Sequence, residues 1–332
     1  MRLLLTLGLV SLTALLAAAD KDEKADLQQP MVNITLRAKG RSPEPEMALD
    51  RRPNIRVDTT LVSIPVAVTD PLSRFVTGLE QENFRLYEDK VEQQIIQFSG
   101  EDTPVSVGVV FDTSGSMGAK LSRSRQAVSQ FLKTANPEDE FFLIEFNDRP
   151  ELVVGFTSNP EELQNRLAFT QAKGSTALLD GLYMAMNQMK KARNPRKAIL
   201  IISDGGDNSS RYTQGEVKNA VRESDVQVYA IGIYEPPDSL GRTPEEAAGP
   251  ELLNVLAEQT GGRAFAVGNL ADLPDVAAKI GIELRNQYVL YYTPKNLTRD
   301  GKYRRVQVKL VKPAGLPALK PTFRTGYYAP TH

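Results

Sequence analysis

The chain contains no cysteine and no tryptophan, and its single histidine, His332, is the last residue. The lack of cysteine excludes disulfide bonds, thiolate metal sites and cysteine nucleophiles. With one histidine at the chain end, a Ser-His-Asp triad or a histidine-rich metal site is nearly excluded. A metal centre in this protein would therefore use oxygen ligands, which suit Mg²⁺, Mn²⁺ or Ca²⁺ better than zinc or copper.

Neither sign of charge dominates the sequence. Lys and Arg number 40 and Asp and Glu number 41, which gives a formal net charge of −1. This balance does not point to a nucleic acid or an acidic membrane surface as a partner. The length of 332 residues allows two domains, and a hydrophobic content of 41% is typical of a globular protein.

The N-terminal segment has the features of an export signal. Residues 1–19 combine a basic start at Arg2, an apolar stretch and three final alanines, which predicts a signal peptide cleaved after Ala19. An uncleaved membrane anchor is the alternative, although the apolar stretch is short for a span. Residues 20–54 are charged and contain prolines, so we expect a flexible linker. Export without cysteine favours a bacterial periplasm or cell envelope, or secretion, over a eukaryotic disulfide scaffold.

Residues 105–117, V-S-V-G-V-V-F-D-T-S-G-S-M, begin with a nearly continuous apolar run. Such a run is typical of a strand buried on both faces of a parallel sheet. The run ends at Asp112, and Ser114 and Ser116 follow in what we expect to be a tight turn. Carboxylate and hydroxyl oxygens are hard ligands for a divalent cation. The alternative is a capped helix start, because Asp and Ser are common N-cap residues.

Two later stretches favour the metal site. Residues 198–203 form a second apolar strand, and Asp204 follows it directly. Two core strands that both end in aspartate place their carboxylates at the same edge of a sheet, where ligands bind in open α/β folds. Thr176, in a loop that opens a helix, would add a hydroxyl from between the two strands.

This ordered set, D-x-S-x-S followed by T and then D, resembles the metal-ion-dependent adhesion site of von Willebrand factor A domains. The resemblance covers residues 104–287. It implies a bound Mg²⁺, or Mn²⁺ or Ca²⁺, whose coordination is completed by a Glu or Asp carboxylate of a partner protein, and no enzymatic activity. The five positions of the signature are Asp112, Ser114, Ser116, Thr176 and Asp204.

Within residues 104–287, apolar strand patterns alternate with amphipathic helix patterns. This alternation predicts a doubly wound, mostly parallel six-stranded sheet with helices on both faces. The expected strands are residues 105–112, 140–146, 152–156, 198–203, 226–233 and 263–267. A loop expected at residues 234–249 would leave a core strand at the same edge as the aspartates. It would either set binding specificity or be a passive surface excursion.

The two flanking segments, residues 55–103 and 288–332, each read as a few short strands. Because neither segment has enough strands to bury its apolar face alone, we expect one β-sandwich built from both termini. Two unrelated β extensions are the alternative. Pro65 predicts an edge strand, because proline cannot donate to a strand ladder. This layout, including R-T-G-Y-Y at residues 324–328, resembles a family of von Willebrand factor A-related proteins described from Acidobacteria.

Two other functions are compatible with parts of the pattern. Haloacid-dehalogenase-like phosphotransferases also end an apolar strand in Asp, but their motif is D-x-D, and position 114 here is Ser. The group that would transfer a proton is therefore missing. No phosphate-binding G-x-x-x-x-G-K-[ST] loop is present. The second possibility is a structural envelope protein whose metal site is vestigial.

Overall fold

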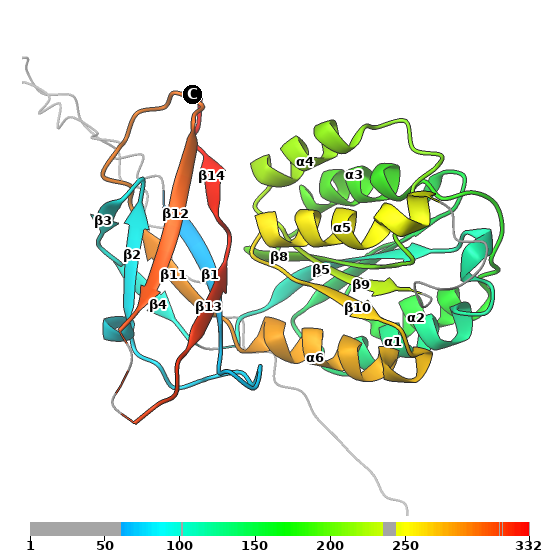
Figure 1. The fold of residues 1–332 in the computed structure, drawn as a ribbon, viewed down its shortest axis with the longest axis horizontal. Coiled ribbons are helices and arrows are strands. Elements are labelled where there is room, and N and C mark those ends of the chain that lie inside the picture. Colours follow the sequence, from blue (N-terminus) through cyan, green and yellow to red (C-terminus); the bar gives the residue numbers. More distant parts are fainter. Residues whose placement is uncertain (1–60, 101, 235–243, 312, 314, 332) are drawn as a thin grey trace, which may run out of the picture. The chain divides into compact units, whose positions relative to one another are not determined.

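The computed structural model in Figure 1 describes residues 61–331, except 101, 235–243, 312 and 314. These residues belong to one compact unit, Val57–His332. The predicted signal peptide and linker lie outside the described residues. Within the described part of the chain, no helix has both the length and the apolar character needed to cross a membrane.

The central sheet has six strands in the order β10-β9-β8-β5-β6-β7 (Figure 1). All neighbouring pairs are parallel except β6 and β7, which are antiparallel. This confirms the predicted doubly wound, mostly parallel sheet. The bounds are β5 Val105–Asp112, β6 Glu140–Phe146, β7 Pro150–Thr157, β8 Arg196–Ser203, β9 Gln227–Ile233 and β10 Ala264–Val267. Every residue of β5 is buried, which explains its continuous apolar sequence.

Helices cover both faces of this sheet (Figure 1). The helices are α1 Leu121–Leu132, α2 Pro160–Ala168, α3 Leu178–Met189, α4 Gln214–Glu223, α5 Pro244–Gln259 and α6 Leu273–Arg285. Because side chains alternate along a strand, Val109 packs with α1, α2 and α6, whereas Val110 packs with α3, α4 and α5. Short 3₁₀ helices lie at Gln81–Asn83, Gly115–Met117 and Leu270–Asp272.

The two flanking segments form two further four-stranded sheets, β13-β1-β11-β4 and β14-β12-β2-β3. Their bounds are β1 Val62–Thr69, β2 Phe84–Glu88, β3 Val91–Gln93, β4 Gln97–Ser99, β11 Tyr288–Tyr292, β12 Tyr303–Leu310, β13 Lys320–Phe323 and β14 Gly326–Tyr328. β1 pairs with β11 and β13, and β2 pairs with β12, so each sheet contains strands from both ends of the described chain. Both sheets contribute to one hydrophobic cluster. The predicted sandwich is confirmed, and the alternative of two unrelated extensions is wrong.

The strand that contains Pro65 lies inside its sheet, so the prediction of an edge strand is wrong. β1 has β13 on one side and β11 on the other. However, β13 pairs with β1 only from Val66 to Thr69, whereas β11 pairs at Pro65 itself through Val289. Pro65 therefore has a neighbouring strand on one side alone, which is how an interior strand tolerates a residue with no N–H.

A buried polar cluster joins the two sheets of the sandwich. Glu88 on β2 is 3% exposed. It accepts hydrogen bonds from the hydroxyls of Tyr292 on β11 and Tyr327 on β14, both at 2.7 Å. The guanidinium of Arg304 on β12 lies 3.7 Å away. This cluster links residues from the two ends of the chain and compensates the burial of the Glu88 charge.

Candidate metal centre

The two predicted aspartates lie at the same edge of the central sheet. β5 and β8 are parallel neighbours, with Phe111 opposite Ile202, so both strands end together. Asp112 is the last residue of β5, and Asp204 follows Ser203, the last residue of β8. The Ser203 hydroxyl donates to Asp112 Oδ2 at 2.5 Å and ties the two strand ends together.

The turn after β5 positions the two serines. The backbone N–H of Ser114 donates to Asp112 Oδ1 at 2.8 Å. The hydroxyl oxygens of Ser114 and Ser116 lie 3.1 Å apart. Ser114 is buried and Ser116 is exposed, so this pair runs from the carboxylate of Asp112 to the protein surface.

The loop that carries Thr176 lies against this turn. The N–H of Gly115 donates to the carbonyl of Gly174 at 3.0 Å. Thr176 is 5% exposed, and its N–H donates to the side-chain oxygen of Asn208 at 2.9 Å. The structure therefore brings together the three segments that contain the five predicted residues, although their role as metal ligands stays a prediction.

The surroundings of Asp112 disfavour the ionised form of its carboxylate. Burial, and then the negative charge of Asp204, raises the pKa of Asp112 to about 7, although hydrogen bonds from Ser114 and Ser203 partly offset this increase. A cation placed beside Asp112 would stabilise the ionised form of its carboxylate.

Asp204 has one satisfied and one unsatisfied oxygen. Its Oδ2 lies 3.1 Å from the ammonium of Lys120. Its Oδ1 is buried and has no hydrogen-bond partner among the described residues. Leaving a buried acceptor unpaired costs about 1–3 kcal/mol. A hard divalent cation would satisfy Oδ1, so the donor set fits a metal such as Mg²⁺.

The candidate centre differs from metal sites rich in acidic side chains. Among the described residues, no group of three or more His, Cys, Asp or Glu side chains could hold a metal ion. The candidate centre has only two carboxylates, and its remaining oxygens belong to neutral hydroxyls. A cation held there would therefore keep more of its positive charge available to an outside anion.

Sequence reasoning missed several residues that build this edge. Asp207 accepts the N–H of Leu178 at the start of α3, and Asn208 accepts the N–H of Thr176. The cap of the following helix, α4, is Thr213. These contacts join segments that are distant in the sequence, and no local pattern indicates them.

Lys120 was also missed, although the sequence carried a signal for it. Lys120 is the N-cap residue of α1. A positive charge at a helix N-terminus opposes the helix dipole, so its presence there calls for a compensating anion. That anion is Asp204.

The loop predicted at residues 234–249 is shorter than expected, because α5 already begins at Pro244. Residues 235–243 lie outside the described residues. Gly249, in the second turn of α5, packs against Gly205, directly after Asp204. The start of α5 thus borders the candidate centre, and a role of the remaining loop in specificity stays a prediction.

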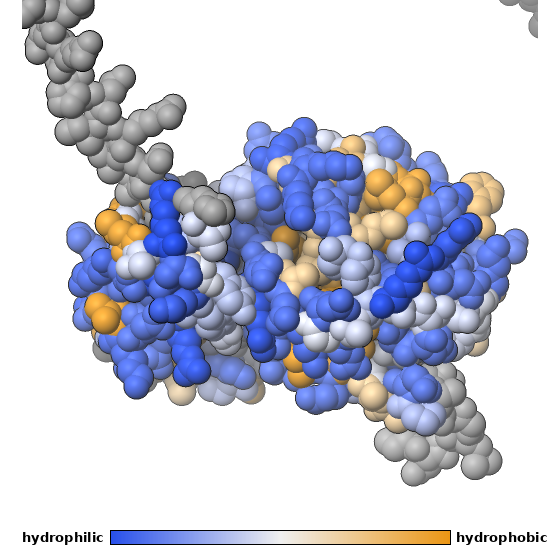
Figure 2. Space-filling view, turned by 90° about the horizontal axis from the view of Figure 1, so that it is seen from above, coloured by the Kyte–Doolittle hydropathy of each residue, from blue (hydrophilic) through white to orange (hydrophobic). Residues whose placement is uncertain are grey.

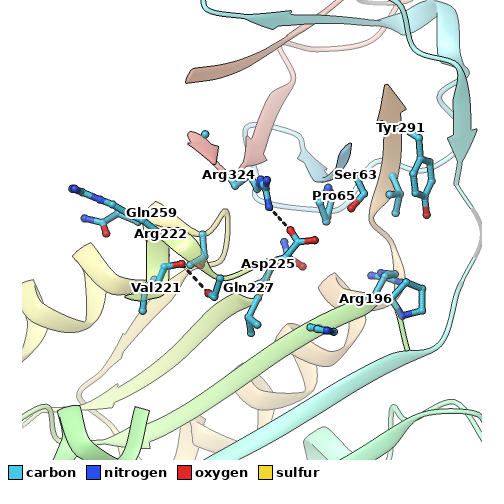
Figure 3. Close-up of a pocket in the computed structure, with 17 residues that line it drawn as sticks. Ser63, Pro65, Arg196, Val221, Arg222, Asp225, Gln227, Gln259, Tyr291 and Arg324 are labelled. Atoms are coloured by element: carbon cyan, nitrogen blue, oxygen red, sulfur yellow. Dashed lines mark hydrogen bonds and ion pairs between the residues drawn. The ribbon is translucent and has the colours of Figure 1, made fainter. Parts of the chain in front are cut away.

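A small cavity of about 50 Å³ lies near the starts of β8 and β9, at the end of these strands opposite the candidate centre (Figure 3). Its lining includes Arg196 at the start of β8 and Gln227 at the start of β9. Arg324 donates a hydrogen bond to Asp225 at this cavity (Figure 3). None of the five predicted metal ligands lines it, so the cavity is separate from the candidate centre.

Comparison with known proteins identifies the part of the chain that carries this centre. Residues 107–206 match the profile of the von Willebrand factor type A domain. The bovine inter-alpha-trypsin inhibitor heavy chain H4 is 30% identical over 135 residues, which are 36% of this chain and 15% of that protein. An uncharacterized protein of Borreliella burgdorferi is 24% identical over 182 residues, which are 48% of this chain and 53% of that protein.

Two solved structures are also similar. A von Willebrand factor type A protein from Catenulispora acidiphila has 13% identity and a TM-score of 0.46. The similarity covers 81% of this chain and 75% of that one. The von Willebrand factor domain of the type V pili tip protein of Porphyromonas gingivalis has 16% identity and a TM-score of 0.43, and the similarity covers 55% of this chain and 97% of that one. The chain spans about 15% of the length of the heavy chain H4 that it matches. The profile match, the six-stranded sheet and the ordered D-x-S-x-S, T and D residues together show that this chain contains a von Willebrand factor type A domain.

Proposed function

We propose that the chain is a divalent-metal-dependent protein-binding module that recognises an acidic residue of a partner. The observation that carries this proposal is the buried Oδ1 of Asp204, which has no partner among the described residues. It belongs to a carboxylate at the sheet edge where the two serines and Thr176 also lie. The residues that would hold the cation are Asp112, Ser114, Ser116, Thr176 and Asp204.

The chemistry of this donor set suits recognition of an anion. When bound, Mg²⁺ would retain water and supply a coordination position for an outside carboxylate. Only two of the five side chains carry a negative charge, so they would not over-neutralise a divalent cation. A Glu or Asp side chain of a partner could therefore replace a water, while the surrounding surface would set specificity.

The face shown in Figure 2 is mostly hydrophilic, with small separate apolar patches, which favours polar over hydrophobic recognition on that face. Residues 1–19 have the features of an export signal, so we also propose that the protein works in a bacterial envelope or is secreted. A pili tip protein among the similar structures is in keeping with a role at a cell surface.

The proposal is tested by a pull-down from envelope extract with residues 20–332 as bait, in Mg²⁺ and in EDTA. We expect a protein that is retained only with Mg²⁺ and is lost with Asp112→Ala. Glu138→Ala is the matched control, because Glu138 is exposed and precedes β6 at the opposite edge of the sheet. Equal retention in Mg²⁺ and EDTA would refute the proposal.

No described contact favours a phosphotransferase. Both oxygens of Asp112 accept hydrogen bonds from serines, and position 114 offers a hydroxyl where a second carboxylate would be needed. We therefore propose no catalytic role. Metal-dependent hydrolysis of p-nitrophenyl phosphate, lost in Asp112→Asn, would contradict this view.

A further inference from the structure

Lys120 places a positive charge inside the candidate metal centre. Its Nζ lies 3.1 Å from Asp204 Oδ2, and the two side chains are 11% and 4% exposed. The ammonium therefore has little access to water, and its attraction to Asp204 is weakly screened. Burying a lysine at a helix N-terminus is unfavourable in itself, so the pairing with Asp204 sets its position.

The two oxygens of the Asp204 carboxylate have different surroundings. Lys120 occupies Oδ2, whereas Oδ1 is left without a protein partner. The ammonium therefore lies next to the carboxylate whose other oxygen remains available to a metal.

The charges at this edge can be counted. Asp112 and Asp204 contribute −2 and Lys120 contributes +1, so the three side chains sum to −1 when both carboxylates are ionised. A divalent cation would bring the sum to +1. Without the lysine charge, the same centre would be neutral after metal binding.

We propose that Lys120 is a built-in counter-charge that weakens metal binding and strengthens the attraction of the metal-loaded centre for an acidic partner. This inference rests on the proposed function. It assigns to one residue opposite effects on the two binding steps. If Lys120 only stabilised the fold, its replacement would change the free energy of unfolding. It would not at the same time strengthen metal binding and weaken the binding of an acidic partner.

The first test is Mn²⁺ titration by calorimetry with the wild type, Lys120→Gln and Lys120→Arg. We expect Lys120→Gln to bind Mn²⁺ at least about tenfold more tightly, because a unit charge within several ångströms of a divalent ion is removed. Lys120→Arg keeps the charge and should stay within about threefold of the wild type. Lys133→Gln is the control, because Lys133 is exposed at the other end of α1.

The second test uses acetate as the simplest carboxylate. Mn²⁺ titrations are repeated with acetate and with chloride at equal ionic strength. We expect acetate to tighten Mn²⁺ binding by a larger factor in the wild type than in Lys120→Gln, by about threefold or more. Chloride should show no such difference between the two proteins.

The outcomes separate this inference from the function beneath it. If the wild type binds Mn²⁺ and Lys120→Gln binds it equally or more weakly, the counter-charge proposal is wrong and the metal site stands. If the wild type binds no Mn²⁺, both are wrong. Thermal unfolding confirms that each variant is folded. Lys120→Met is the replacement if Lys120→Gln is not folded, with the same expected gain in Mn²⁺ affinity.

Discussion

Gly205 and Gly249 pack backbone against backbone beside the candidate metal centre. A Cβ atom added to Gly205 would lie 2.7 Å from Gly249 Cα, and one added to Gly249 would lie 2.7 Å from the Gly205 carbonyl carbon. Gly205 also has a φ of +81°, which other residues rarely adopt. Because Gly205 follows Asp204 directly, the start of α5 constrains the carboxylate of Asp204.

Replacing either glycine should therefore disturb both stability and the metal site. We expect Gly205→Ala to lower the free energy of unfolding by about 1–3 kcal/mol, as strain and overpacking add. We also expect Gly205→Ala to bind Mn²⁺ more weakly than the wild type does. Urea denaturation and calorimetry measure the two effects. Gly155→Ala in β7 is the control, because no atom beyond its two chain neighbours lies within 4 Å of its added Cβ. A stability loss equal to that of Gly205→Ala would contradict the explanation.

Asp112→Asn should separate metal binding from folding. The amide keeps the shape of the side chain but loses the charge that a cation needs. Because burial raises the pKa of Asp112 to about 7, we expect the variant in EDTA at alkaline pH to be at least as stable as the wild type. Metal at about 100 times its Kd should stabilise the wild type by about 2.7 kcal/mol. If Mg²⁺ raised the Tm of Asp112→Asn as much as that of the wild type, the assignment of Asp112 as a metal ligand would be wrong.

The raised pKa of Asp112 also predicts a pH dependence. The ordinary pKa of an aspartate is 3.8, and the folded value is about 7, so the folded chain holds the extra proton between these values. The contribution of Asp112 to stability without metal should therefore decrease as pH rises from about 4 to 7, and level off above.

Metal binding should show the opposite trend. The cation binds the ionised form, so Mn²⁺ affinity should rise over the same pH range and up to about one proton should be released per metal below pH 7. Calorimetry in buffers of different ionisation enthalpy measures both quantities. An affinity that is constant through this range would show that Asp112 is not a ligand.

The sandwich offers a prediction that is independent of metal. Arg304 is 3% exposed, donates to the carbonyl of Thr298 at 2.8 Å and lies beside the buried Glu88. Arg304→Met leaves that carboxylate without its cation and should lower the free energy of unfolding by about 3–5 kcal/mol. The neighbouring Arg305 is exposed, so Arg305→Met should change the free energy of unfolding little in the same urea titration. Equal effects of the two variants would contradict the role of the Glu88 cluster.

The central sheet and the placement of the candidate ligands were predictable because they depend on local patterns. A buried parallel strand such as β5 is apolar throughout, and its end is marked by Asp112. The order of neighbouring strands then brings Asp112 and Asp204 to one edge. The pairing of the two flanking segments was predictable because each segment has too few strands to form a stable sheet alone.

The residues that were missed act across the chain. Lys120, Asn208 and Asp207 contact groups that lie tens of positions away in the sequence, so the local sequence does not show which groups they contact. An interior strand tolerates Pro65 because β13 ends at Phe323, opposite Val66, and no pattern around the proline shows this. The sequence predicts a cation site at this edge, but it does not show which neighbouring side chains position the predicted ligands.

The shared sandwich has a consequence for how the chain is made. β1 and β2 are synthesised early, but their partners β11, β12 and β13 lie after the whole type A domain. The loop-closure entropy of these pairings is large unless the intervening domain has already folded and drawn its ends together. Until then, the early strands have open edges that can join other chains. A product truncated after α6 would thus be prone to aggregate even though its central sheet is complete.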